Sequence, residues 1–162
     1  FKRFQYICAM KKIFILLLSA FTFVSACKKK ENCAENTTKA TESEVVSLRD
    51  YLTANSIITK EDPRGFFYIV TDSVYGSKPT TCDNIRIAYK GTLLNGTVFD
   101  QSNSAVFTLS NLIVGWQQAL PLIGIGGSIK IYLPPSLAYG NKASGSIPAN
   151  SNLIFEIDLL GF

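Results

Sequence analysis

The chain has 162 residues, of which 47% are hydrophobic, and this length allows one sizeable core and therefore one folded domain. Half of its 16 basic residues lie before residue 40, and from there onward eight basic residues face ten acidic ones, which excludes a basic nucleic-acid footprint. The absence of histidine excludes Ser-His and Cys-His nucleophile pairs, imidazole metal sites and an imidazole general base.

The amino end has the pattern of an export signal. Lys11 and Lys12 precede fourteen uncharged residues, 13–26, and Cys27 follows. A basic start, a short apolar run and small residues at its end are typical of a signal peptide. The run is shorter than the roughly 20 residues that span a bilayer. A buried core helix is the alternative, although the run has no polar face. Met10 is the only methionine, so we expect translation to begin there.

The end of this run, VSAC, resembles the lipobox of bacterial lipoproteins. The resemblance implies that cleavage occurs before Cys27 and that its thiol carries diacylglycerol. Each buried methylene contributes about 0.8 kcal/mol, so two or three acyl chains insert firmly. We therefore expect membrane anchoring through the lipid on Cys27 at the bacterial cell envelope, at the outer membrane on its periplasmic or its surface side.

Residues 27–40 are polar and lack apolar periodicity, which predicts a flexible tether behind the lipidated cysteine. Export places Cys33 and Cys82 in a compartment where a disulfide persists. If they pair, closing a loop of nearly fifty residues contributes about 4 kcal/mol in the chain-entropy model. Two unrelated free thiols are the equal alternative.

A helix of about three turns is predicted after this tether. Thr41 stands three positions before Glu44, which is the spacing of a capping box. Val45, Leu48 and Leu52 then fall on one face of a helix over residues 41–56.

Strand patterns dominate the remainder of the chain. Apolar and polar positions alternate over 84–90 and over 152–162, which predicts strands with one buried and one solvated face. Asn95-Gly96 predicts a hairpin with a type I′ turn, because both residue types tolerate positive φ. Further strands are expected over 66–70, through Phe99, over 105–110 and over 128–133, with a short helical turn over 112–120.

Many short strands with one short helix among them predict an α+β fold, in which an antiparallel sheet curls around that helix and an extra helix precedes it. The loop 134–151 is long for a compact domain, so we expect it to be functional. The predicted segments are residues 1–26 with the signal peptide, 27–40 with the lipidated cysteine and tether, 41–62 with the N-terminal helix and connector, and 63–162 with the main domain.

Four separated stretches resemble one family in order and spacing. They are YKGTLLNGTVFDQS, FTL followed by LIVGWQQAL, KIYLPPSLAYG, and IPANSNLIFEIDLL. Together they are similar to the FKBP-type peptidyl-prolyl cis-trans isomerases over residues 63–162. The resemblance implies the FKBP-like fold and an apolar pocket with few polar groups, which takes the proline ring of a substrate.

Carried over residue by residue, the resemblance implies that Trp116 forms the floor under the proline ring. The other substrate-binding residues would be Leu112, Ile113, Ile147 and Phe155, and the catalytic residues would be Tyr89, Phe99, Asp100 and Tyr139. The Tyr139 hydroxyl and the main-chain N–H of Ile113 would bind the substrate backbone. Asp100 would accept a hydrogen bond from Tyr89 at the rim and face the twisting amide. Taken singly, each of these residues also has a purely structural interpretation, as part of the core, of a turn or of a hairpin end.

The sequence departs from the family pattern at several positions. Ala105 stands where many relatives carry an aromatic residue, so one wall of the cleft is expected to be lower. The connection between FTL and Trp116 is about two residues shorter than in small relatives, and Ser144 lies near a position where those relatives have histidine. These changes bear on substrate preference and macrolide affinity. Pro121 is expected to terminate or kink the short helix.

The resemblance implies a peptidyl-prolyl cis-trans isomerase that acts on proline-containing exported polypeptides and assists their folding at the cell envelope. It implies no cofactor and no metal, and it adds macrolide inhibitors as ligands. Two other classes of function use the same cleft. One is a non-catalytic proline-peptide-binding or chaperone module, which Ala105 favours, and the other is a carrier of an apolar ligand.

Overall fold

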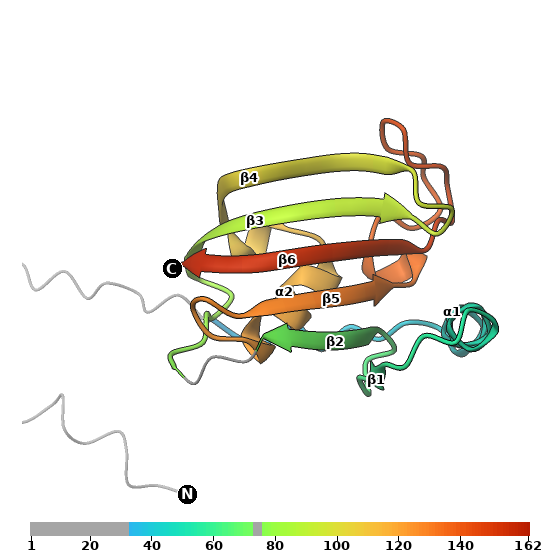
Figure 1. The fold of residues 1–162 in the computed structure, drawn as a ribbon, viewed down its shortest axis with the longest axis horizontal. Helices are drawn as coiled ribbons and strands as arrows, with labels where there is room; N and C mark the ends of the chain where they lie inside the picture. Colours follow the sequence, from blue (N-terminus) through green and yellow to red (C-terminus); the bar gives the residue numbers. More distant parts are fainter. Residues whose placement is uncertain (1–32, 73–75) are drawn as a thin grey trace, which may run out of the picture. The chain divides into compact units, whose positions relative to one another are not determined.

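The computed structural model describes residues 33–72 and 76–162, so the predicted signal peptide and Cys27 lie outside the described residues (Figure 1). The elements are α1 (Glu42–Ala54), β1 (Lys60–Glu61), β2 (Phe67–Asp72), β3 (Asn84–Leu93), β4 (Val98–Thr108), α2 (Val114–Ala119), β5 (Ser128–Leu133) and β6 (Leu153–Gly161). Three 3₁₀ helices complete them: η1 (Leu109–Asn111), η2 (Leu120–Leu122) and η3 (Pro135–Leu137). Within this part of the chain, no helix combines the length and the hydropathy needed to cross a membrane.

The strands form one six-stranded sheet in the order β1-β2-β5-β6-β3-β4, with every neighbouring pair antiparallel. The short helix α2 packs against one face of this sheet, and β3, β6 and β5 pass across it (Figure 1). This confirms the predicted α+β fold, an antiparallel sheet curled around a short helix with an extra helix at its N-terminal side.

The apolar and polar residues that alternate in the sequence point to opposite faces of the sheet. In β6, Leu153, Phe155, Ile157 and Leu159 are at most 3% exposed, while the residues between them are more accessible. These side chains share one core with Trp116 and with the strand residues of β3 and β5 that point to the same face. Burying side chains of this size contributes about 1.5–3 kcal/mol each, so this face fixes the register of the sheet.

Helix α1 covers part of the opposite sheet face. Its buried side chains Val45, Leu48 and Leu52 pack with Phe67 of β2 and Tyr132 of β5. Tyr132 lies between two residues that face α2, so the period of two in a strand places it on the other side. The capping-box prediction is confirmed at Thr41, whose backbone N–H donates to the Glu44 carboxylate at 3.4 Å.

Two sequence predictions, for β4 and for the turn before it, differ from the fold. The strand through Phe99 and the strand over 105–110 are one strand, β4, because bulged pairing with β3 keeps the polar residues between them in the sheet. The Asn95-Gly96 hairpin is present, but the turn is not type I′, since Gly96 has φ +86° and Asn95 does not have positive φ. Leu93 accepts the Gly96 N–H and donates to Thr97, which is the pattern of a three-residue loop.

Strand β1 and the turn η2 are two short segments beside the main elements. Strand β1 has two residues and was not expected, since a pair of residues carries no periodicity. Pro121 follows the end of α2 at Ala119 and lies inside η2, so the helix stops at the expected place and the chain tightens into a 3₁₀ turn.

Residues 33–40, called here the N-terminal strap, do not behave as the predicted flexible tether. Cys33 forms a disulfide with Cys82, with 5.3 Å between the Cα atoms. At the other end, the backbone N–H of Ala40 donates to the Arg64 carbonyl at 2.9 Å. The strap therefore belongs to the folded domain, and the rest of the predicted tether lies outside the described residues.

Candidate active site

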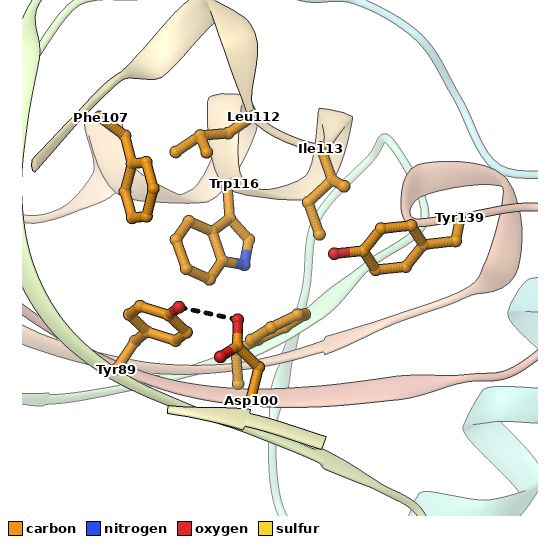
Figure 2. Close-up of a pocket in the computed structure, with 8 residues that line it drawn as sticks. Tyr89, Asp100, Phe107, Leu112, Ile113, Trp116 and Tyr139 are labelled. Atoms are coloured by element: carbon orange, nitrogen blue, oxygen red, sulfur yellow. Dashed lines mark hydrogen bonds between the residues drawn. The ribbon is translucent and has the colours of Figure 1, made fainter. Parts of the chain in front are cut away.

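A cavity of about 170 Å³ opens between α2, the loop before it and strands β3, β4 and β6 (Figure 2). Its lining is mostly aromatic or aliphatic, with one carboxylate at the edge. The lining residues are Tyr89, Asp100, Phe107, Leu112, Ile113, Trp116, Tyr139 and Phe155. Such a cavity is suited to a small apolar ring with polar groups at its margin.

Trp116 forms the base of the cavity. Its indole lies edge-on to the rings of Tyr89, at 5.2 Å, and Phe155, at 5.0 Å, and only 4% of the residue is exposed. Gly115 explains how α2 comes so near the sheet, since a Cβ at this position would overlap the Leu133 side chain of β5. The missing side chain thus brings the indole against the strands.

The indole nitrogen adds one polar group to this base. Trp116 Nε1–H is buried and has no hydrogen-bond partner among the described residues. Leaving such a donor unpaired costs about 1–3 kcal/mol, so an acceptor on a bound ligand would relieve this cost. In Figure 2 the nitrogen lies on the side of the ring that faces Ile113 and Tyr139.

A hydrogen-bonded pair lies at the mouth of the cavity. The Tyr89 hydroxyl donates to Asp100 Oδ2 at 2.7 Å, as the family resemblance implied (Figure 2). Burial and the neighbouring Asp100 carboxylate together raise the pKa of Tyr89 to about 12. The phenol therefore stays protonated at neutral pH, where it acts as a donor to the carboxylate.

Tyr139 reaches the cavity from the long loop between β5 and β6. It follows η3, and its hydroxyl points toward the interior of the cavity in Figure 2, although 41% of the residue is exposed. Partial burial, and then the Asp100 charge, raise the pKa of Tyr139. The expectation that this loop is functional gains support from that position, because the hydroxyl is a neutral donor beside an apolar wall.

The loop between η1 and α2 provides the remaining wall. Leu112 and Ile113 line the cavity, and the Ile113 carbonyl accepts the first backbone N–H bonds of α2, from Trp116 at 3.0 Å and Gln117 at 3.3 Å. The start of the helix is therefore fixed to the wall residue beside it.

Two of the expected site residues do not line the cavity. The Phe99 ring packs over Gly91, where a Cβ would lie 2.5 Å from it, and lies edge-on to Phe155 at 5.4 Å. Ile147 is 5% exposed and belongs to the core, beside its bridge to Ser144. Phe99 and Ile147 pack in the same core as Trp116, outside the cavity lining.

Phe107 lines the cavity and was not among the expected site residues. Its ring lies 6.3 Å from that of Tyr89. The signal depends on the register of two strands, which the sequence alone does not give: Phe107 pairs across the strands with the inward-facing Ile85. Residues that pair directly across two strands point to the same face, so the phenylalanine of FTL had to point inward as well.

The arrangement provides a mostly apolar cavity with hydrogen-bond donors and one carboxylate at its margin. In the part of the chain that the structure describes, no three His, Cys, Asp or Glu side chains are grouped so that they could hold a metal ion. Rotation about a peptide bond breaks no covalent bond, but it removes amide resonance, and a planar amide is better solvated by water than a twisted one. A hollow of this kind favours the twisted form relative to bulk water.

Comparisons with known proteins agree with this geometry. A family model described as FKBP-type peptidyl-prolyl cis-trans isomerase matches residues 76–160, slightly more than half of the chain. The chain is 39% identical over 117 residues to the FKBP-type peptidyl-prolyl cis-trans isomerase FkpA of Aeromonas hydrophila, covering 68% of this chain and 44% of that protein. It is also 39% identical over 103 residues to a Legionella longbeachae protein named outer membrane protein MIP, covering 60% and 44% of the two chains.

Solved structures give the same result. The crystal structure of FkpA from Escherichia coli superposes with a TM-score of 0.67 and 34% identity, covering 74% of this chain and 59% of that one. The chain spans less than half the length of the two curated relatives above. The matching family model, the strand order and the aromatic cavity together show that the chain belongs to the FKBP-type peptidyl-prolyl cis-trans isomerase family.

Proposed function

We propose that this protein catalyses rotation about X–Pro peptide bonds in exported polypeptides and so assists their folding. The observation that carries the proposal is the Tyr89–Asp100 hydrogen bond at the mouth of an aromatic cavity whose base is Trp116. The cavity is of a size and chemistry that fit a proline ring, and in this proposal the Asp100 carboxylate would face the amide next to that ring.

The proposed mechanism needs binding and desolvation only. The barrier to rotation is about 18–20 kcal/mol, and every 1.36 kcal/mol of preference for the twisted amide gives about a tenfold gain in rate. Trp116 and Phe155 would hold the ring, and the Tyr139 hydroxyl and the Ile113 N–H would bind the substrate carbonyls. Asp100, held by Tyr89, would face the amide as it twists. Phe99 and Ile147 would support the residues that line the cavity.

A protease-coupled assay on an Ala-Pro or Leu-Pro peptide tests the proposal. We expect the slow phase of cleavage to accelerate in proportion to protein concentration, and a macrolide that competes for the cavity to suppress the acceleration. A binding or chaperone module would instead change Trp116 fluorescence with proline peptides and leave the rate equal to that in buffer. That outcome would replace the enzymatic proposal by the binding one.

We further propose that the protein acts at the cell envelope, anchored through lipid on Cys27. The support is the signal-like run of residues 13–26, the VSAC stretch and the name outer membrane protein MIP of one relative. Residues 1–26 would be removed, 27–32 would remain as a short tether, 41–62 would form the helix and connector, and 63–162 would be the isomerase domain.

Mass spectrometry of the membrane-extracted protein tests the anchor. The expected mature chain starts at Cys27 and carries the mass of two or three acyl chains, and the Cys27→Ser variant lacks that mass. A mature wild-type chain with an unmodified Cys27 would contradict the lipid assignment and leave the isomerase proposal untouched.

A further inference from the structure

The side chain of Gln117 holds the loop that forms one wall of the cavity. Its Nε2 donates to the carbonyl of Leu112 at 2.7 Å and to the carbonyl of Ser110 at 3.2 Å. Leu112 lines the cavity, and Ile113 follows it directly. Gln117 itself does not line the cavity, so it acts on a ligand only through this loop.

The orientation of the Gln117 amide is determined from its far end by the N-terminal strap. Asn36 Nδ2 donates to Gln117 Oε1 at 2.9 Å, across 81 positions of sequence. Both Nε2 protons of Gln117 point at carbonyls and its oxygen accepts from Asn36, so each atom of the amide has a matching partner. A carboxylate at position 117 would place a second oxygen against two carbonyls.

The strap is held in place independently of this contact. Gln118 Nε2 donates to the carbonyls of Asn36, at 3.1 Å, and Thr38, at 2.7 Å. The Cys33–Cys82 disulfide fixes the start of the strap, and Thr81 Oγ1 donates to the Ala34 carbonyl at 3.2 Å. The segment that carries Cys82 also contacts the cavity loop, because the Ser110 N–H donates to the Thr81 carbonyl at 2.8 Å.

We propose that Gln117 is a positioning residue for the proline pocket, and that the disulfide-fastened strap sets its orientation through Asn36. The proposal rests on the proposed isomerase function for its kinetic consequence. Breaking the Asn36–Gln117 contact frees the amide to turn, and the Leu112–Ile113 wall then loses its fixed place. The wall shapes substrate binding, so the effect falls on KM more than on kcat.

The size of the effect follows from the surroundings of these amides. Asn36 and Gln117 border a polar cleft of about 580 Å³ that is open to water, so their lost contacts are partly replaced by solvent. A hydrogen bond between such groups makes a modest net contribution, which predicts a rise in KM of about three- to tenfold.

The experiment compares KM and kcat of the full chain with those of Asn36→Ala, Gln117→Ala, the double variant and Gln117→Glu. We expect each single variant to raise KM about three- to tenfold at nearly unchanged kcat, and the double variant to be no worse than Gln117→Ala, because one contact is lost in both. Gln117→Glu should be at least as damaging as Gln117→Ala. Asn103→Asp, an exposed change on β4 outside the cavity, adds the same charge and should leave KM unchanged.

A spectroscopic readout separates positioning from simple loss of stability. The backbone amide resonance of Ile113 should shift in Asn36→Ala and in the Cys33→Ser/Cys82→Ser pair, at temperatures well below unfolding. A KM that stays at the wild-type value in these variants, with an unshifted Ile113 resonance, would overturn the proposal. A wild-type chain without isomerase activity would overturn the proposed function instead, while the Ile113 shift would still report the positioning.

Discussion

Among single residues, the pair at the mouth of the cavity matters most for the proposed catalysis. The 2.7 Å bond between the Tyr89 hydroxyl and Asp100 Oδ2 fixes a carboxylate that is otherwise exposed on β4. A fixed charge stabilises a transition state at a lower free-energy cost of reorganisation than a mobile one, because its orientation is already determined when the substrate binds. The neutral hydroxyl of Tyr139 lies on the other side of the opening.

Asp100→Ala is expected to lower kcat/KM by about tenfold or more while proline-peptide binding persists, since the loss of one oriented group at a reacting centre is of that order. Asp100→Asn is the matched control, because it keeps an acceptor for Tyr89 without the charge. The measurement is the coupled isomerase assay together with a fluorescence titration of Trp116. Equal rates for wild type and Asp100→Ala would remove Asp100 from the mechanism.

The raised pKa of Tyr89, about 12, makes a prediction about stability at high pH. In the unfolded chain the phenol loses its proton near pH 10, whereas in the folded chain it keeps the proton to about pH 12, so stability falls as pH rises between these values. Below pH 10 this contribution is fully present. Tyr89→Phe should therefore show a shallower fall.

Urea unfolding of wild type and Tyr89→Phe at neutral pH and at two values within that interval checks this sign. The comparison of the two proteins cancels the contributions of the other tyrosines. A fall that is equally steep in both would mean that Tyr89 does not keep its proton in the folded chain.

At the scale of elements, α2 and the sheet set the depth of the cavity. Gly115→Ala is expected to destabilise the fold by about 1–3 kcal/mol, because the added methyl overlaps a fully buried Leu133 and pushes the helix from the sheet. Gly76→Ala is a control in open space. Denaturant titration of both variants measures the effect, and equal midpoints would show that α2 does not pack as closely as described.

The elements that could be predicted from the sequence are those with a local, periodic signal. The alternation in β3 and β6 and the capping box of Thr41 depend on neighbours within a few residues, so they appear in the sequence as they do in the fold. That β4 is one continuous strand depends on bulges in its pairing with β3. The three-residue turn at Gly96 depends on hydrogen bonds across the turn. Such features arise from the partner strand, which local patterns do not contain.

The residues of the candidate site also fall into those that the sequence predicted and those that it did not. Trp116, Tyr89 and Asp100 were expected from motif order, and the cavity includes all three. Phe99 and Ile147 do not line it, because the Phe99 ring packs over Gly91 and Ile147 packs in the core, which is a matter of contacts between distant strands. The strap was missed because its polar residues make specific long-range hydrogen bonds in place of an apolar face.

In the described part of the molecule, helices cover two faces of one sheet and a disulfide joins the N-terminal strap to the segment before β3. The Cys33–Cys82 bond spans 49 positions, which contributes about 4 kcal/mol in the chain-entropy model. The Cys33→Ser/Cys82→Ser pair should unfold at a correspondingly lower urea concentration than the oxidised chain. Identical midpoints would mean that the bond adds nothing beyond the hydrogen bonds of the strap.

The central claim is that this cavity lowers the barrier to rotation of an X–Pro bond. Exchange spectroscopy by NMR measures the cis–trans rate of a Leu-Pro peptide at equilibrium, without a coupling protease. We expect a rate that rises with the concentration of wild-type protein, and a much smaller rise with Asp100→Ala. A rate equal to that of the peptide alone, while Trp116 fluorescence reports that the peptide is bound, would contradict it.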